Sequence, residues 1–97
     1  MTVNAIGLGQ LRNHTRGYFG RVEDGETLGV VRRGRLVAWI QPRADDRFPD
    51  SAWIPVQLKA FRTQASRFFD RVAAGQPIEV FHQGRAIARI RAASASP

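Results

Sequence analysis

The 97-residue sequence contains no cysteine, a single lysine and no long apolar run. The lack of cysteine excludes disulfides and thiolate metal sites, which fits a reducing cytosol. No run reaches the roughly 18 apolar residues of a membrane-spanning helix. The N-terminal stretch MTVNAIGLGQ also lacks the basic and apolar segments of a signal peptide. We therefore expect a soluble, cytoplasmic protein.

Groups that perform catalysis are also scarce. His14 and His82 occupy unrelated positions, and no nucleophile motif, metal-ligand spacing or phosphate-binding glycine loop accompanies them. Trp39 and Trp53 could stack on nucleic-acid bases, but each lies in an apolar strand pattern that favours the core or an interface. We expect no enzymatic activity, no cofactor and no metal.

Positive charge, in contrast, is abundant and almost wholly arginine. Lys and Arg number 15 against 8 Asp and Glu, which gives a net charge of +7, and Lys59 is the only lysine. The guanidinium group binds phosphate through two parallel hydrogen bonds, so an arginine excess favours a polyanionic partner such as double-stranded DNA. An arginine-rich proteome would produce the same excess without such a partner.

The sequence contains two similar segments of equal length. Residues 6–42 align with residues 56–92 without a gap and share eleven identities over 37 positions. Such a match indicates a tandem duplication. The identical pairs are Leu8/Leu58, Arg12/Arg62, Phe19/Phe69, Arg21/Arg71, Val22/Val72, Gly25/Gly75, Val30/Val80, Gly34/Gly84, Arg35/Arg85, Ala38/Ala88 and Ile40/Ile90.

Each copy begins with a short apolar run, which predicts a strand at residues 2–6 and another at residues 52–56. Pro55 in the second run lacks an N–H donor, which suits a strand at the edge of a sheet. An apolar stripe with helical spacing follows and ends at Gly25 and Gly75, which predict helix caps. The stripe consists of Leu8, Leu11, Thr15, Tyr18, Phe19 and Val22 in the first copy and Leu58, Phe61, Ala65, Phe68, Phe69 and Val72 in the second.

Two strands joined by a tight turn complete each copy. The dipeptides Arg33-Gly34 and Gln83-Gly84 occupy the turns, because glycine supplies the positive φ that a two-residue hairpin turn needs. The predicted organisation is a first unit at 1–42, a polar linker at 43–51, a second unit at 52–92 and a flexible tail at 93–97.

A unit of about 40 residues without a disulfide or metal is too small to bury its own apolar faces. We therefore expect an α+β fold in which the two strand-helix-strand-strand units pack against each other about a pseudo-twofold axis. Together they would form one compact domain, in which each unit is the dimer partner of the other.

The repeated pattern resembles the N-terminal domain of the Phd/YefM (prevent-host-death) antitoxin family. The similarity lies in LGQLRNHTRGYFGRVEDGETLGVVRRGRLVAWIQP and LKAFRTQASRFFDRVAAGQPIEVFHQGRAIARI. The resemblance implies a dimeric DNA-binding fold that represses its own operon, whereas a separate C-terminal segment neutralises a toxin. After Arg91 this sequence has only AASASP, so toxin binding by such a tail is not expected.

Two functions from different classes are therefore open. The first is a nucleoid-associated DNA-binding regulator that acts as a single-chain pseudo-dimer and can assemble further into homo-oligomers. The second is a protein-interaction module, or a reduced antitoxin, that binds a toxin or another protein through its folded surface. A matched pair of arginines near the two helix starts, Arg12 and Arg62, favours the first.

The candidate DNA-binding residues lie near the helix starts and in the hairpin turns. The turns are the less specific candidates, because basic turns are also common on solvated surfaces. Arg21 and Arg71 lie on the opposite flank of their helices, where a structural ion pair or an interface contact is expected. The candidates are Arg12, Arg62, Arg32, Arg33, Arg35, Arg85, His82, Arg16 and Lys59.

Overall fold

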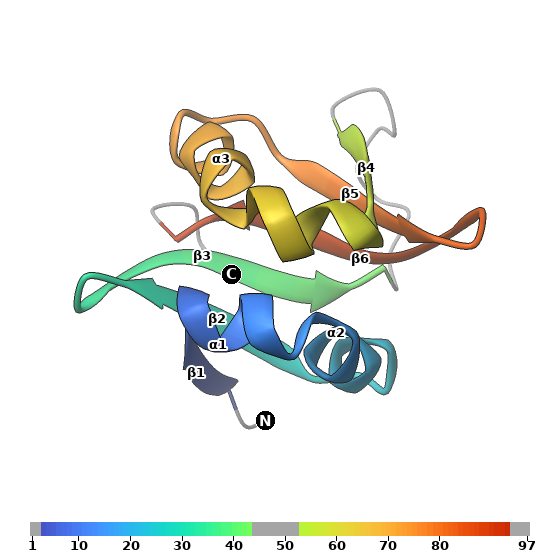
Figure 1. Ribbon diagram of the computed structural model, residues 1–97, viewed down its shortest axis with the longest axis horizontal. Helices are drawn as coiled ribbons and strands as arrows, with labels where there is room; N and C mark the ends of the chain where they lie inside the picture. The colour runs from blue at the N-terminus through green and yellow to red at the C-terminus, as the bar shows by residue number, and fades with distance from the viewer. Residues whose placement is uncertain (1–2, 44–52, 94–97) are drawn as a thin grey trace.

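The computed structural model describes residues 3–43 and 53–93, which form one six-stranded sheet with helices on one face (Figure 1). The α+β class expected from the sequence is confirmed. The predicted linker and tail lie almost entirely outside the described residues. The elements are β1 (Val3–Gly7), α1 (Leu8–Asn13), α2 (Thr15–Glu23), β2 (Thr27–Arg32), β3 (Arg35–Pro42), β4 (Ile54–Gln57), η2 (Leu58–Ala60), α3 (Phe61–Ala73), β5 (Ile78–His82) and β6 (Arg85–Ala92).

The two halves of the sheet have the same topology. The first strand of each half pairs in parallel with the second, so that Asn4 lies opposite Leu28 in one half and Ile54 opposite Ile78 in the other. These pairs are related by a shift of 50 positions, the offset at which the sequence repeats. The strand order β1-β2-β3-β6-β5-β4 reads the same from either edge once β1 to β3 are matched with β4 to β6.

The third strands, β3 and β6, join the halves. They run antiparallel, and Ile40 lies opposite Ile90, the residue 50 positions further along the chain. As a result β1 and β4 form the two edges of the sheet. Pro55 lies in β4, and an edge strand tolerates its missing N–H donor because one side of the strand needs no partner.

Both hairpins turn on the dipeptides that the sequence indicated. The φ angles are 54° and 77° at Arg33 and Gly34, and 53° and 77° at Gln83 and Gly84. Two successive positive φ values are the signature of a type I′ turn, which matches the twist of the strands it connects. The backbone of the two turns is therefore nearly identical, and they differ only in their side chains.

The predicted helices end as expected but are interrupted in the middle. Gly25 and Gly75 follow the helix ends with φ of 108° and 98°. However, His14 has φ −133° and ψ 43°, which separates α1 from α2. Its counterpart Gln64 has φ −125° and ψ 21°, which kinks α3 at the same place. The expectation of one continuous helix in each half is therefore wrong, and the break occurs at equivalent positions of the two halves.

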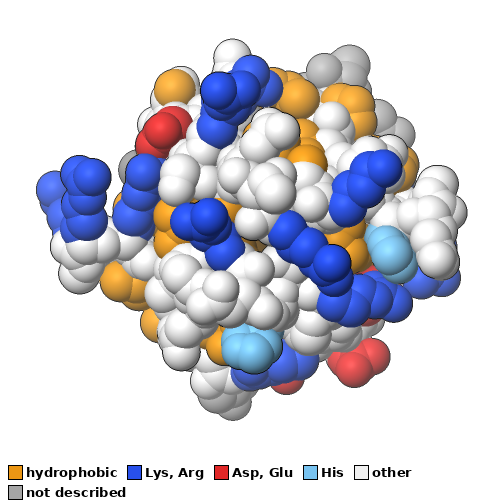
Figure 2. Space-filling model, in the orientation of Figure 1, with side chains coloured by type: hydrophobic (Ala, Val, Ile, Leu, Met, Phe, Trp, Pro, Cys, Tyr) orange, Lys and Arg blue, Asp and Glu red, His pale blue; other side chains and the backbone are white. Residues whose placement is uncertain are grey.

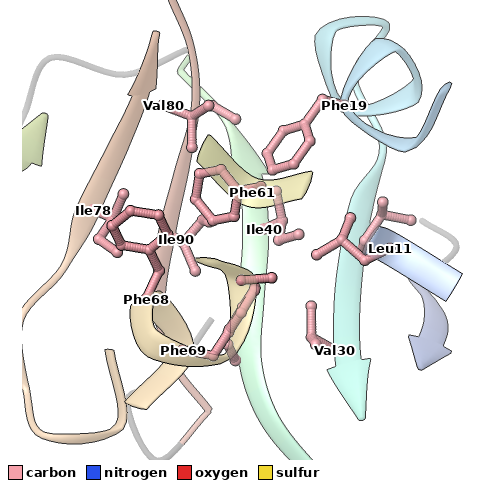
Figure 3. Packing of buried hydrophobic residues seen from close by; sticks show 14 of the residues in the cluster. Leu11, Phe19, Val30, Ile40, Phe61, Phe68, Phe69, Ile78, Val80 and Ile90 are labelled. Atoms are coloured by element: carbon pink, nitrogen blue, oxygen red, sulfur yellow. The ribbon is translucent and has the colours of Figure 1, made fainter. Parts of the chain in front are cut away.

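The apolar stripes and the sheet enclose one core that both halves share. Phe61, from α3, is fully buried, and its ring centre lies 5.5 Å from that of Phe19 in the first half. The ring centres of Phe68 and Phe69 lie 5.1 and 6.2 Å from it. Figure 3 shows Phe61 between Phe19 on one side and Ile90 on the other.

No helix in the described residues is long and apolar enough to cross a membrane.

Phe61→Ala should lower the free energy of unfolding by about 4 kcal/mol, because it leaves a cavity where the two halves meet. Urea denaturation followed by circular dichroism measures the loss. Leu36→Ala is the control, since Leu36 is 41% exposed, and it should cost much less. Separate unfolding transitions for the two halves in the wild-type protein would contradict a shared core.

Candidate nucleic-acid interface

The break at His14 shapes the surface where the two halves approach each other. The hydroxyl of Thr15 donates to the carbonyl oxygens of Leu11 and Arg12, at 2.9 and 3.1 Å, and satisfies the end of α1. The chain then restarts as α2, while Arg12, Asn13 and His14 remain exposed. The break therefore presents three consecutive polar side chains to solvent, which an uninterrupted helix would distribute around its axis.

Arg12 and Arg62 line the same open hollow, which has a volume of about 430 Å³ and also contains Arg16. Both side chains belong to exposed residues. Within residues 3–43 and 53–93 neither makes an ion pair. The structure thus brings together the two matched arginines that the sequence singled out, one from each half. Figure 2 shows basic side chains spread across this face, with acidic ones toward its margins.

The hairpin turns lie at opposite ends of the same face (Figure 1). Arg33 and Arg35 belong to the β2–β3 turn and are exposed. Arg85 is exposed at the start of β6, whereas His82 is half-buried at the end of β5. A hairpin therefore lies at each end of the molecule.

Three of the predicted residues are engaged in ion pairs, two of them between the halves. Arg32 donates to Asp70 of α3 at 2.6 Å, and Arg85 donates to Glu23 of α2 at 3.4 Å. Arg16 lies 3.7 Å from the same Glu23 carboxylate. One arginine of each hairpin thus pairs with a carboxylate on a helix of the other half. Exposed pairs of this kind stabilise the fold by at most about 1 kcal/mol, so they orient side chains more than they stabilise.

Lys59 lies apart from these groups. It is exposed in η2, at the start of the second helical segment. It does not line the hollow that Arg12 and Arg62 share. Its counterpart in the first copy is Gly9, so the two halves do not present this charge symmetrically.

The prediction that Arg21 forms a structural ion pair is confirmed. Its guanidinium donates to Glu26 at 2.8 Å and lies over the Tyr18 ring, 5.5 Å from the ring centre. The hydrogen bond raises the pKa of Arg21 and lowers the pKa of Glu26. Arg71 is exposed and makes no ion pair among the described residues, since Gln76 replaces the glutamate there.

Comparison with known proteins gives a partial match. No family model matches the chain, and no solved structure matches it. A segment of 40 residues is 55% identical to the antitoxin VapB47 of two strains of Mycobacterium tuberculosis, CDC 1551 and H37Rv. It is equally similar to an uncharacterized protein, Mb3441, of Mycobacterium bovis. The match covers 41% of this chain and 40% of each relative, so it spans about two fifths of the relatives' own length.

The opposite face of the sheet carries a charged cluster that was not predicted from the sequence. Side chains alternate along a strand, so Glu79 and Arg89, each next to core residues, point away from the helices. Arg89 and Arg43 donate to the same Glu79 oxygen, at 2.9 and 2.8 Å. Arg89 also lies over Trp53, 4.5 Å from the ring centre. Arg43, the first residue of the predicted linker, is thus tied to the second half.

The buried carboxylate of Glu79 is held in its ionised form. Burial alone would raise its pKa, but the hydrogen bonds from Arg89 and Arg43 outweigh burial and leave the pKa below its ordinary value of 4.5. Only 7% of Glu79 and 5% of Arg89 is exposed. Removal of the Glu79 carboxylate would therefore deprive the buried Arg89 of its opposite charge. Within the described ranges, no cluster of three or more His, Asp or Glu side chains could hold a metal ion.

Glu79→Gln should lower the free energy of unfolding by about 3 kcal/mol at neutral pH, because Arg89 loses its buried carboxylate. A lowered folded-state pKa stabilises above the ordinary value of 4.5, and this contribution disappears as the pH falls through the folded-state pKa. The gap between variant and wild type in urea denaturation should therefore shrink below about pH 4.

A gap that stays constant into the acid range would contradict this assignment. Asp70→Asn is the matched control, because it removes the exposed partner of Arg32. It should change the stability little at any pH.

Proposed function

We propose that the protein is a DNA-binding transcriptional regulator of the Phd/YefM antitoxin type, which binds operator DNA as a single-chain pseudo-dimer and represses transcription. The observation that carries this proposal is the convergence of Arg12 and Arg62, from equivalent positions of the two halves, on one exposed hollow. Association with the nucleoid in the cytoplasm follows from it.

The chemistry of the hollow suits a duplex. An exposed guanidinium without an acidic partner can donate two hydrogen bonds to phosphate or to the O6 and N7 atoms of guanine. Arg12 and Arg62 fit this description, since no carboxylate of the described chain pairs with them. Asn13 and His14, exposed beside Arg12, supply further groups that can contact base edges or phosphates.

The size of the molecule limits how it can bind. Its principal extents, measured on Cα atoms, are 31 × 28 × 27 Å. Many dimeric regulators read two half-sites whose centres are about 34 Å apart, one helical turn of DNA. The Cα trace is shorter than that separation, and the paired arginines share one hollow. Both arginines therefore enter a single major groove, which is about 12 Å wide.

The comparisons support the antitoxin part of the proposal. The relatives named antitoxin share 55% identity over 40 residues with this chain. Because that segment covers only 40% of each relative, the activity of the whole relative is a proposal for this protein. The net charge of +7 supports the DNA-binding part.

The relatives' name also favours a second candidate function, in which the folded surface binds a toxin. Its test is co-expression with the product of a small reading frame adjacent to this gene, followed by size-exclusion chromatography. A stable complex would establish toxin binding. Separate elution of the two proteins would contradict it for that partner.

The double variant Arg12→Ala/Arg62→Ala should weaken binding to the DNA upstream of its own reading frame by about 100-fold, because two guanidinium contacts are lost. A gel mobility-shift titration against scrambled DNA measures the change. Arg71→Ala is the control, since this exposed arginine lies on the other flank of α3, and it should bind nearly as tightly as the wild type. An unchanged affinity in the double variant would contradict the assigned interface.

The salt dependence provides an independent check. With about four to six phosphate contacts, the logarithm of the binding constant should fall against the logarithm of the salt concentration with a slope of about −4 to −5. The same titration repeated at several salt concentrations gives this slope. A flat response would exclude phosphate contacts as the source of affinity.

A further inference from the structure

The two hairpin turns have the same backbone conformation, but the charges at the two ends of the molecule differ. The type I′ turns have φ values within one degree of each other, so the side chains at 33 and 83 are presented in the same way. Yet Arg33 has Gln83 as its counterpart, and Arg32 has His82. The difference between the ends is therefore chemical, with no difference in turn geometry.

The end formed by the β2–β3 turn presents unpaired positive charge. Arg33 and Arg35 are exposed, and neither makes an ion pair in the part of the chain that the structure describes. They line a hollow of about 680 Å³ together with Arg32, whose charge is already matched by Asp70. Two guanidinium groups remain available for phosphates at this end.

The opposite end is close to neutral. Arg85, the counterpart of Arg35, donates to Glu23 at 3.4 Å. Glu23 and Asp24 line a hollow of about 520 Å³ with Arg85 and Arg43. Two carboxylates near the path of a phosphate backbone oppose its approach. This end therefore holds DNA more weakly than the first.

The hollow that Arg12 and Arg62 share is also lined differently by the two halves. Arg16 lines it, with its charge matched by Glu23, and the equivalent position of the second half is Ser66. The residues that follow the paired arginines also differ, with Asn13 and His14 in the first half and Thr63 and Gln64 in the second. Side chains with different donors and acceptors read different base edges.

From these differences we infer that the protein occupies an asymmetric DNA site in one fixed orientation. The first half always faces the same side of the site, and the β2–β3 turn binds the phosphates on that flank. This inference rests on the proposed DNA binding. It adds a polarity that a homodimer, with two identical faces, does not have.

The absence of cysteine makes a direct test possible. A single cysteine at Asp24 or at Ala74, which are exposed and equivalent positions of the two halves, can carry a DNA-cleaving iron chelate. Position 74 follows Ala73, beside the basic hollow, and position 24 lies in the hollow at the other end. The DNA is a duplex selected from a random-sequence pool by repeated rounds of binding to the wild-type protein.

Each labelled protein should cleave one flank of the selected site about tenfold more than the other, because one unequal base contact alone discriminates by that factor or more. The two labels should cleave opposite flanks. Equal cleavage of both flanks by each label would overturn the fixed orientation and leave DNA binding intact. Failure to select any duplex over the random pool would overturn the proposed function itself.

Two matched variants test the assigned groups. Arg33→Ala/Arg35→Ala should reduce the salt slope by about 2, whereas Gln83→Ala/Arg85→Ala should reduce it by less than about 1. The exchange Arg33→Gln/Gln83→Arg preserves both turns, since each residue already occupies this conformation in the other half. It should lower the cleavage ratio several-fold. Equal slopes in the two double variants, or an unchanged ratio after the exchange, would overturn the role of the β2–β3 turn.

Discussion

The antiparallel pairing of β3 with β6 is the contact on which the molecule depends. Through it Ile40 lies opposite Ile90, and two three-stranded halves become one six-stranded sheet. The helices can then cover a surface that neither half offers alone. Phe61 of the second half packs against Phe19 of the first within the shared core. The same pairing places the first helical turns side by side, which is why Arg12 and Arg62 reach one hollow.

Much of the fold could be predicted because its signals are local. The dipeptides Arg33-Gly34 and Gln83-Gly84 specify turns by a backbone preference that needs no tertiary information. The apolar stripe that ends at Gly25 and Gly75 likewise specifies a helix and its cap. The similarity between residues 6–42 and 56–92 added what local signals lack, because it predicts a pairing that treats both halves alike. The paired position of Arg12 and Arg62 was accessible from the sequence for this reason.

The features that could not be predicted arise from small irregularities. The apolar stripe continues in phase across His14 and Gln64, so the periodicity gives no sign of the break. In the second hairpin, the register shifts at a bulge between Val80 and Phe81. If strand pairs are counted back from the turn without this shift, Glu79 does not lie opposite Arg89. The buried ion pair therefore could not be predicted from the sequence. Ion pairs between the halves depend on the packing angle of the helices, which the sequence does not encode locally.

Joining the two halves in one chain also changes what a mutation does. In a dimer of identical chains every substitution appears twice, and a residue that suits one side must suit the other. Here Glu79 and Arg89 face each other in one half, while Gly29 and Trp39 occupy the equivalent positions of the other. A substitution can therefore alter one half without altering the equivalent position of the other. Because the two halves belong to one chain, dilution cannot separate them.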